Sequence, residues 1–227
     1  MTSEGGRTAM AEQGRNRVDR RKARTRAALV RAAQTCIAEG RTAVPILEIT
    51  QLADVGMGSF YNHFDTKEQL FQAAVEDALE AFGSTLDTLT EDIDDPAAVF
   101  AQSFRLTGRL HRKHPELSRV LLHNGLNLAR AGQGLAPRAR RDIEAAVHAG
   151  RFTAVRDTDL ALAVVTGAAL TLGQLLHDEP ARDDAAAADL VTEDLLRMFG
   201  VPADEARALC QRPLPDPDTL PERGTAA

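Results

Sequence analysis

The sequence predicts an all-α protein with a small N-terminal domain of three helices and a larger helical C-terminal domain. Apolar residues recur with the period of an α-helix along nearly the whole chain. Proline and glycine separate these segments at positions typical of helix ends, and no segment has the pattern of a β-strand. With 227 residues, 44% of them hydrophobic, the chain is long enough to bury a substantial core.

Cysteine content and hydropathy indicate the compartment. Cys36 and Cys210 are the two cysteines, and they lie too far apart to suggest a disulfide framework or a CxxC metal site. We find no apolar N-terminal stretch of signal length and no run near the roughly 18 apolar residues that a membrane span needs. We therefore expect a soluble cytoplasmic protein with no membrane partner.

Charge is unevenly distributed. Residues 1–45 contain ten Arg or Lys against four Asp or Glu, a net of +6; since the whole chain carries −6, the remainder carries −12. A basic N-terminal segment followed by an acidic remainder predicts that the N-terminal surface binds a polyanion. Residues 1–17 are expected to form a flexible basic tail, whereas the cations from Arg20 to Arg31 fall on a periodic helix.

The N-terminal domain is predicted over residues 18–66. Its first helix runs from Asp19 to Glu39 and stops at Gly40. A second short helix follows Pro45 and ends near Ala53. Asp54 tolerates the left-handed conformation of a tight turn, and Gly56 can serve as the N-cap of a third helix over residues 57–63.

The C-terminal domain is predicted over residues 67–211. Asp65 and Glu68 have the spacing of a capping box that opens a long helix reaching about Leu86. Further helices are expected at 96–113, 115–130, 137–149, 158–178, 184–199 and 203–211, separated by turn signals such as Asp94-Asp95-Pro96. Residues 212–227 are proline-rich and are expected to form an irregular tail.

Two short helices joined by a turn and buttressed by a basic helix make a helix-turn-helix unit, whose second short helix enters the major groove of DNA. Small residues such as Gly58 let the backbone approach. Asn62 can pair with adenine, and Met57 is limited to apolar contacts. Tyr61, His63 and Lys67 are expected at phosphates. The predicted DNA-binding residues are Arg24, Met57, Gly58, Ser59, Tyr61, Asn62, His63 and Lys67.

These residues resemble the TetR (tetracycline repressor) family of bacterial transcription regulators. The resemblance covers about fifty residues, from Arg20 to Phe71, and its pattern is Ile49, Ala53, Val55, Gly58, Ser59, Phe60, Tyr61, His63, Phe64, Lys67, Glu68 and Leu70. The sequence departs from the family at Thr50, Asp54 and Gly56, which leaves the operator sequence open. The resemblance implies an all-helical C-terminal domain that binds an effector and dimerises. Because one short recognition helix makes too few contacts with DNA, we expect a homodimer on a palindromic operator.

Polar residues on otherwise apolar stretches motivate a pocket for a small hydrophobic effector in the second domain, because buried polar groups need partners. Ordinary hydrogen bonds within the core are the alternative. The predicted ligand-binding residues are Phe100, Phe104, Thr107, His123, Leu126, Asn127, Thr171 and Gln174, with Ser103 beside the two phenylalanines.

Large aliphatic residues alternate with small ones in "LALAVVTGAALTLGQLL", a composition that lets helices approach closely. We predict that the helices near 158–178 and 184–199 pair with their mates as a four-helix bundle. A buried helix of the monomer core is the alternative. The predicted interface residues are Leu160, Val164, Gly167, Ala168, Thr171, Leu175 and Leu195.

An enzyme is the weak hypothesis. His111, His114, His123 and Glu116 are the nearest approach to a metal set, but Arg112 and Lys113 are poor neighbours for a cation. No phosphate-binding glycine loop and no GxSxG motif is present. We expect no catalytic residue, metal or cofactor. The main rival is a DNA-binding regulator without an effector, controlled by a protein partner or by abundance, and a real internal pocket would count against it.

Overall fold

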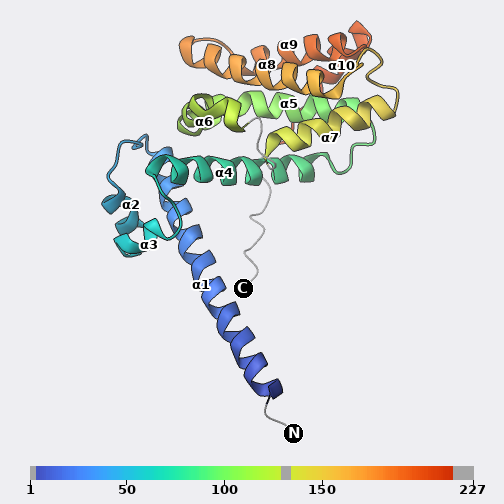
Figure 1. Ribbon diagram of the computed structural model, residues 1–227. Helices are drawn as coiled ribbons and strands as arrows, with labels where there is room; N and C mark the ends of the chain where they lie inside the picture. Colours follow the sequence, from blue (N-terminus) through green and yellow to red (C-terminus); the bar gives the residue numbers. More distant parts are fainter. Residues whose placement is uncertain (1–3, 129–133, 217–227) are drawn as a thin grey trace. The chain divides into compact units, whose positions relative to one another are not determined.

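The computed structural model describes the backbone of residues 4–128 and 134–216 and the side chains of residues 19–122 and 134–216. Within these ranges the chain is all helical and contains no strand, which confirms the predicted fold class (Figure 1). The helices are α1 (Glu4–Ala38), α2 (Ile46–Leu52), α3 (Met57–Tyr61), α4 (Lys67–Thr90), α5 (Pro96–Lys113), α6 (Pro115–Leu128), α7 (Leu135–His148), α8 (Thr158–Asp178), α9 (Asp184–Met198) and α10 (Ala203–Cys210).

The chain separates into two compact units, Met1–Val75 and Glu76–Ala227. The division falls inside α4, not at its start as the sequence suggested. The first turns of α4 therefore complete the core of the first unit, and its remaining turns belong to the second unit.

The first unit has the predicted three-helix arrangement. Helix α1 begins at Glu4, so the backbone is helical over most of the segment expected to be a tail. It ends before Gly40, whose φ of 69° is the left-handed conformation that favours glycine. Asp54 also has a positive φ, 54°, in the turn between α2 and α3. Fully buried Leu29, Ile49, Phe60 and Leu70 form the centre of the unit.

The start of α4 is capped one residue later than predicted. Thr66 Oγ1 accepts a hydrogen bond from the backbone N–H of Gln69 at 3.2 Å, and Gln69 Oε1 accepts from the N–H of Asp65 at 2.9 Å. The first bond satisfies a free N–H group of the first turn, and the second ties the Gln69 side chain back to the residue before the cap, an arrangement similar to a capping box. The predicted pair of Asp65 and Glu68 is wrong because Gln69, not Glu68, reaches back over the helix start.

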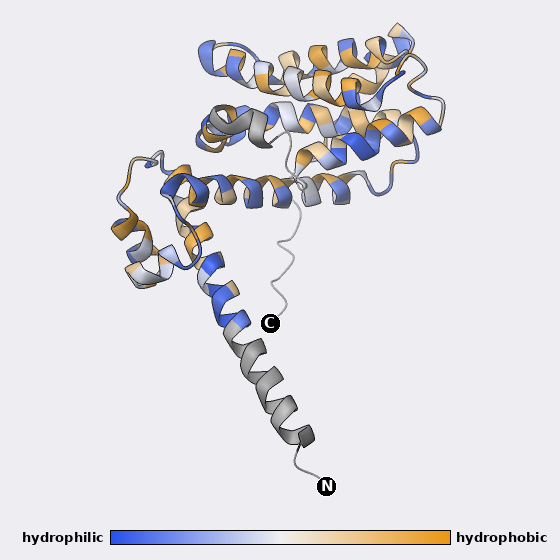
Figure 2. Cartoon of the chain, viewed as in Figure 1, coloured by the Kyte–Doolittle hydropathy of each residue, from blue (hydrophilic) through white to orange (hydrophobic). Residues whose placement is uncertain are grey.

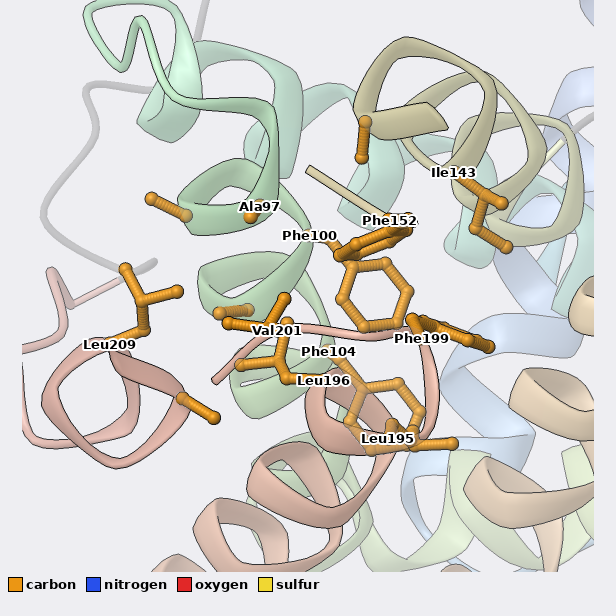
Figure 3. Close-up of a cluster of buried hydrophobic side chains, with 14 of the residues drawn as sticks. Ala97, Phe100, Phe104, Ile143, Phe152, Leu195, Leu196, Phe199, Val201 and Leu209 are labelled. Atoms are coloured by element: carbon orange, nitrogen blue, oxygen red, sulfur yellow. The ribbon is translucent and has the colours of Figure 1, made fainter. Parts of the chain in front are cut away.

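In the second unit α5 is the central helix and packs against α6, α7, α8, α9 and α10. Aspartates cap three of the helices: Asp95 for α5, Asp157 for α8 and Asp183 for α9 accept from N–H groups of the first turn. These caps explain why the predicted starts agree with the structure. Buried phenylalanines form the core beside α5, and their ring centroids lie 4.9–6.1 Å apart (Figure 3).

Helix α8 is unusually apolar. By length and composition alone it could cross a membrane, although the sequence analysis found no such segment, and 28% of the residues in its most apolar window are buried. Figure 2 shows hydrophobic residues along both α8 and α9. One side of α8 packs on the core, while the other side exposes Leu160, Val164 and Leu175.

Candidate functional site

The predicted recognition surface lies on α3 and the turn after it. Gly56 and Gly58 have open space around them, since a Cβ atom added to either would meet nothing within 4 Å. Met57 and Tyr61 are 40% and 58% exposed, and Asn62 is also exposed. Phe60 is fully buried and anchors α3 to the core of the first unit. Backbone and side chains of α3 are thus accessible to a large, close-fitting partner.

Basic side chains of α1 lie beside the end of α3. The guanidinium of Arg26 sits over the Phe64 ring at 5.2 Å from its centroid. Burial, together with the nearby charges of Lys22 and Arg26, lowers the pKa of His63. Arg24 is exposed but lies on the opposite side of α1, because two residues correspond to about 200° of helix rotation. Lys22 and Arg26 are therefore closer to the predicted recognition surface than Arg24 is.

Lys67 has an internal partner. Its Nζ donates a hydrogen bond to the Val44 carbonyl at 3.2 Å and so ties the start of α4 to the residue before Pro45. Ser59 and His63 are half-buried. A phosphate contact by Lys67 stays a prediction, and the structure adds a structural role for the same amine.

The second unit contains a cavity of about 120 Å³. Helices α4, α5, α6, α7 and α8 all contribute to its wall, which is mostly apolar. The residues that line it are Glu76, Leu79, Leu86, Asp87, Phe100, Ser103, Phe104, Thr107, His111, Leu121, Leu135, Ala136, Arg138, Ala139, Arg141, Asp142, Val165, Thr166, Ala169 and Leu170. A cavity of similar size, about 150 Å³, is known to hold benzene.

A charged network forms the α4–α7 edge of the cavity. Arg138 donates to both carboxylate oxygens of Glu80, at 2.8 and 2.9 Å, and to Asp87 at 2.8 Å. The hydrogen bond from Arg138, reinforced by the N–H of Gly134, lowers the pKa of Glu80 to about 2. A Cβ atom on Gly83 would lie 2.7 Å from Arg138 Nη1, so the glycine makes room for this side chain.

Asp142 presents a carboxylate oxygen at this edge. Arg141 donates to Asp142 Oδ1 from Nε and Nη2, at 3.0 and 2.8 Å. The other oxygen, Oδ2, accepts no hydrogen bond from the side chains or backbone that the structure describes. Burial raises the pKa of Asp142, and the hydrogen bonds from Arg141 offset this only in part. Asp142 Oδ2 is thus an available acceptor beside an apolar cavity.

A hydrogen-bonded chain runs from the cavity wall toward the surface. His111 Nε2 lies 3.2 Å from the Ala169 carbonyl, and Nδ1 lies 2.7 Å from Ser118 Oγ. Because a carbonyl only accepts, Nε2 carries the proton and Nδ1 accepts from Ser118. Ser118 Oγ then accepts from His177 Nε2 at 2.9 Å. Burial lowers the pKa of His111 to about 4, so its ring is neutral near pH 7.

The structure supports only some of the predicted ligand contacts. Phe100, Phe104 and Thr107 line the cavity. Thr171 and Gln174 do not: both are exposed on the other side of α8, and their side chains bond to Gly167 O and Asp178 Oδ1. The polar residues of α8 alternate between two faces, so this cavity gives no support to Thr171 and Gln174 as ligand contacts, and their role stays a prediction. His123, Leu126 and Asn127 lie outside the residues whose side chains are described.

The predicted interface residues also divide. Leu160, Val164, Gly167, Thr171 and Leu175 form one exposed stripe along α8. Ala168 is half-buried against the core. Leu195 is 5% exposed and lies in the phenylalanine core (Figure 3), so its burial gives no support to its assignment to an interface. The position of Leu195 along α9 has the helical spacing expected of a contact stripe, but its side chain lies on the face of α9 that packs into the core.

The histidine-rich HRKH segment does not assemble a metal site with described residues. Within residues 19–122 and 134–216, no three His, Cys, Asp or Glu side chains are placed to hold a metal ion. His111 instead occupies the notch left by Gly173, where a Cβ atom would come 2.3 Å from the His111 ring. Gly173 therefore serves packing within one chain.

Sequence reasoning did not identify the charged side of the cavity. Arg138 and Asp142 share a helical face with Ala146, which is fully buried, and Asp142 is itself buried. Charges at i and i+4 on a buried face are costly unless they are paired. Charged residues at the helical spacing of apolar residues were the signal available in the sequence. It was overlooked because the segment "RARRD" has the composition of a solvent-exposed surface.

Comparisons with known proteins agree with this architecture. Residues 28–74 match the family described as "Bacterial regulatory proteins, tetR family", and residues 95–212 match "Tetracyclin repressor-like, C-terminal domain". Among solved structures, RolR in complex with resorcinol is 36% identical, with a TM-score of 0.68, over 87% of this chain and 98% of RolR. RolR without ligand is 37% identical, also with a TM-score of 0.68, over 84% of this chain and 99% of RolR.

A more distant structure shares the fold alone. FadR from Bacillus subtilis, in complex with stearoyl-CoA, is 16% identical over 75% of this chain and 97% of FadR, with a TM-score of 0.57. No curated protein matches the chain significantly.

Proposed function

Since the chain belongs to the TetR family of bacterial transcription regulators, we propose that it is a cytoplasmic repressor that binds a palindromic operator as a homodimer and is released by a small aromatic effector. One observation carries the effector part of this proposal. The second unit holds a cavity of about 120 Å³ that is lined by apolar and polar side chains of five helices. A concave, mostly apolar pocket with a few polar groups is the usual form of a small-molecule site.

The size and chemistry of the cavity indicate the effector class. Phe100, Phe104 and Leu135 supply apolar surface for one flat ring, and the volume is near that which holds benzene. Asp142 Oδ2 supplies an acceptor for a hydroxyl group. RolR, which is 36% identical, was solved with resorcinol, a benzene ring with two hydroxyl groups. A phenolic compound with a single ring fits both observations.

The structure also supports a route from effector to DNA. Helix α4 contributes Leu79, Leu86 and Asp87 to the cavity wall, and its first turns belong to the DNA-binding unit. An effector that binds one arrangement of α4 better than another shifts the equilibrium by that difference in affinity. The arrangement preferred by the bound effector holds the two recognition helices of the dimer out of register with the operator.

The effector proposal is tested by thermal unfolding and operator binding in the presence of simple phenols. Resorcinol at a concentration of 100 times its Kd should stabilise the protein by about 2.7 kcal/mol and lower its affinity for operator DNA. Asp142→Asn should weaken both effects, because an amide is a poorer acceptor than a carboxylate. A phenol that stabilises the protein but leaves operator affinity unchanged would refute the release mechanism.

The DNA-binding proposal is tested with matched variants on the recognition surface. Tyr61→Phe removes one hydroxyl from an exposed ring and should weaken binding to operator and scrambled DNA by the same factor. Asn62→Ala should cost about 1–3 kcal/mol on the operator and change which bases are preferred. Lys67→Ala is less informative, because it also removes the bond to Val44. If Asn62→Ala weakened all sequences equally, Asn62 would not read bases.

A further inference from the structure

The polar side chains around the cavity can be accounted for one by one. Asp87, Arg138, Arg141 and Asp142 belong to the charged network on the α4–α7 edge. Thr107 Oγ1 donates to the Ser103 carbonyl at 2.8 Å. Both nitrogens of His111 are engaged, and Glu76 also has a partner. Each of these groups is held in place by the protein.

Two hydroxyl groups are left over. Ser103 on α5 and Thr166 on α8 both line the cavity. Neither side chain makes a hydrogen bond to any residue in the described ranges, 19–122 and 134–216. The case of Thr166 is unusual, because other threonines in the helices of this protein, such as Thr107 and Thr171, bond back to the carbonyl four residues earlier. Thr166 Oγ1 makes no such hydrogen bond.

Ser103 and Thr166 are half-buried, and a ligand that fills the cavity displaces water from their hydroxyl groups. That loss of water costs about 1–3 kcal/mol unless the ligand itself forms hydrogen bonds with these hydroxyl groups. We propose that Ser103 and Thr166 bind a second polar substituent of the effector, apart from the hydroxyl group that Asp142 accepts, and so select a ring with two polar groups over a ring with one.

This inference rests on the proposed function and refines it. A serine or threonine hydroxyl both donates and accepts, so the second substituent is itself a hydroxyl or a carbonyl oxygen. The two residues come from α5 and α8, which pack together. A ring that bonds Asp142 on α7 and these hydroxyls on α5 and α8 would hold three helices of the cavity wall together.

The test compares two probes of nearly equal shape, resorcinol and 3-methylphenol, by isothermal calorimetry on the full-length protein. The methyl group of 3-methylphenol takes the place of one hydroxyl. Wild type should prefer resorcinol by about tenfold or more, since one net hydrogen bond is worth about 0.5–1.5 kcal/mol and an unpaired polar group adds to the difference. Ser103→Ala and Thr166→Val should each reduce this preference about threefold to tenfold, mainly by weakening resorcinol.

Thr107→Val is the matched comparison. Its hydroxyl also lies at the cavity, but it already bonds to Ser103 O, so its removal should change the affinity of both probes by the same factor. The ratio of the two affinities is the readout, and a general loss of fold would not change it selectively. Thermal unfolding without ligand checks that each variant folds.

The outcomes separate the two proposals. Wild type that binds resorcinol, with a preference that Ser103→Ala and Thr166→Val both leave unchanged, overturns the assignment of these hydroxyls and leaves the proposed effector class intact. Wild type that binds neither probe overturns the single-ring phenol class and this inference with it. A reduced preference in the Ser103 and Thr166 variants, with the preference intact in Thr107→Val, supports the assignment.

Discussion

His111 shows how one residue can couple a cavity to packing. Its ring fills the notch at Gly173, its Nε2 bonds to Ala169 O, and its Nδ1 accepts from Ser118. Every polar atom of the ring is used, so the side chain is fixed in one orientation and one tautomer. The cost of this arrangement is that the ring cannot easily accept a proton.

This cost gives a dependence of stability on pH. The pKa of His111 falls from its ordinary value of 6.5 to about 4 in the folded protein. Between these two values the unfolded chain takes up a proton that the folded form excludes, so the free energy of unfolding decreases as the pH falls through this window. The full loss at this site is about 3 kcal/mol. Urea unfolding at pH 7, 6, 5 and 4.5 measures it.

His111→Phe is the control for this prediction. The phenyl ring has a similar outline and cannot titrate, so the variant should start less stable at pH 7 and lose less on acidification. His177→Gln tests the second histidine of the hydrogen-bonded series that joins His111, Ser118 and His177, because burial also lowers the pKa of His177. If His111→Phe kept the full slope between pH 6.5 and 4.5, another group would be responsible.

Single residues also mark the limit of sequence reasoning. Thr171 and Leu195 show this limit, because helical spacing gives the relative directions of side chains but not which direction faces the core. Thr171 follows the exposed stripe of α8, whereas Leu195 points into the core. Asp142 was missed because its burial depends on the pairing with Arg141 and on the cavity beside it, which no local pattern reveals.

At the scale of elements, α8 has two faces with different tasks. Val165, Thr166, Ala169 and Leu170 line the cavity, while the stripe from Leu160 to Leu175 is exposed. A change at one face is therefore one helix diameter, about 10 Å, from the other. Any movement of α8 caused by a bound effector reaches the exposed stripe directly.

The two glycines of α8 should respond to substitution with opposite signs. Gly173→Ala forces a Cβ atom to within 2.3 Å of the His111 ring, and such overpacking costs about 1–3 kcal/mol. Gly167 has open space around it within one chain, and a methyl group is far smaller than the indole of Gly167→Trp, so Gly167→Ala should stabilise the helix by up to about 1 kcal/mol. Urea unfolding at one protein concentration compares them, and a destabilised Gly167→Ala would reveal a close contact at that position.

Helix positions were more predictable than helix roles. Asp95-Pro96, Asp157 and Asp183 are local signals whose side chains cap the backbone directly, so α5, α8 and α9 begin where the sequence places them. The start of α1 was not predictable in this way, since the residues before Asp19 are mostly polar or small and carry no apolar period. The boundary between units fell inside α4 because packing, not a break in the helix, defines it.

At the scale of the whole molecule, the stripe of α8 exposes several large apolar side chains to solvent. Leu160 is 67% exposed, Val164 45% and Leu175 38%, and Leu190 and Met198 on α9 are exposed as well. Contiguous exposed apolar surface of this kind marks a protein interface. It supports the prediction that α8 and α9 pair with a second copy of the chain.

The dimer prediction is tested by placing charge on the stripe. Val164→Glu and Leu160→Glu would each bury an unpaired carboxylate, which costs several kcal/mol, and should raise the dissociation constant of the dimer by more than about a hundredfold. Gly167→Trp should act through bulk. Sedimentation velocity over a range of concentrations measures the change.

Val147→Glu provides the comparison for these variants, because Val147 is an exposed apolar residue on α7 and belongs to neither α8 nor α9. It should leave the dimer intact. Dimerisation at full strength in both Val164→Glu and Leu160→Glu would move the interface to another surface.

The burial of both cysteines has a consequence for oxidation chemistry. Cys36 and Cys210 are 0% and 5% exposed, and burial raises the pKa of both thiols, that of Cys210 to about 11. The thiolate is the form that peroxides and alkylating reagents attack, and near neutral pH this protein offers almost none. The wild-type chain should therefore be nearly inert to maleimide reagents while folded, and a cysteine introduced at an exposed site outside the predicted interface, such as Val147, would carry a label without competition from the native thiols.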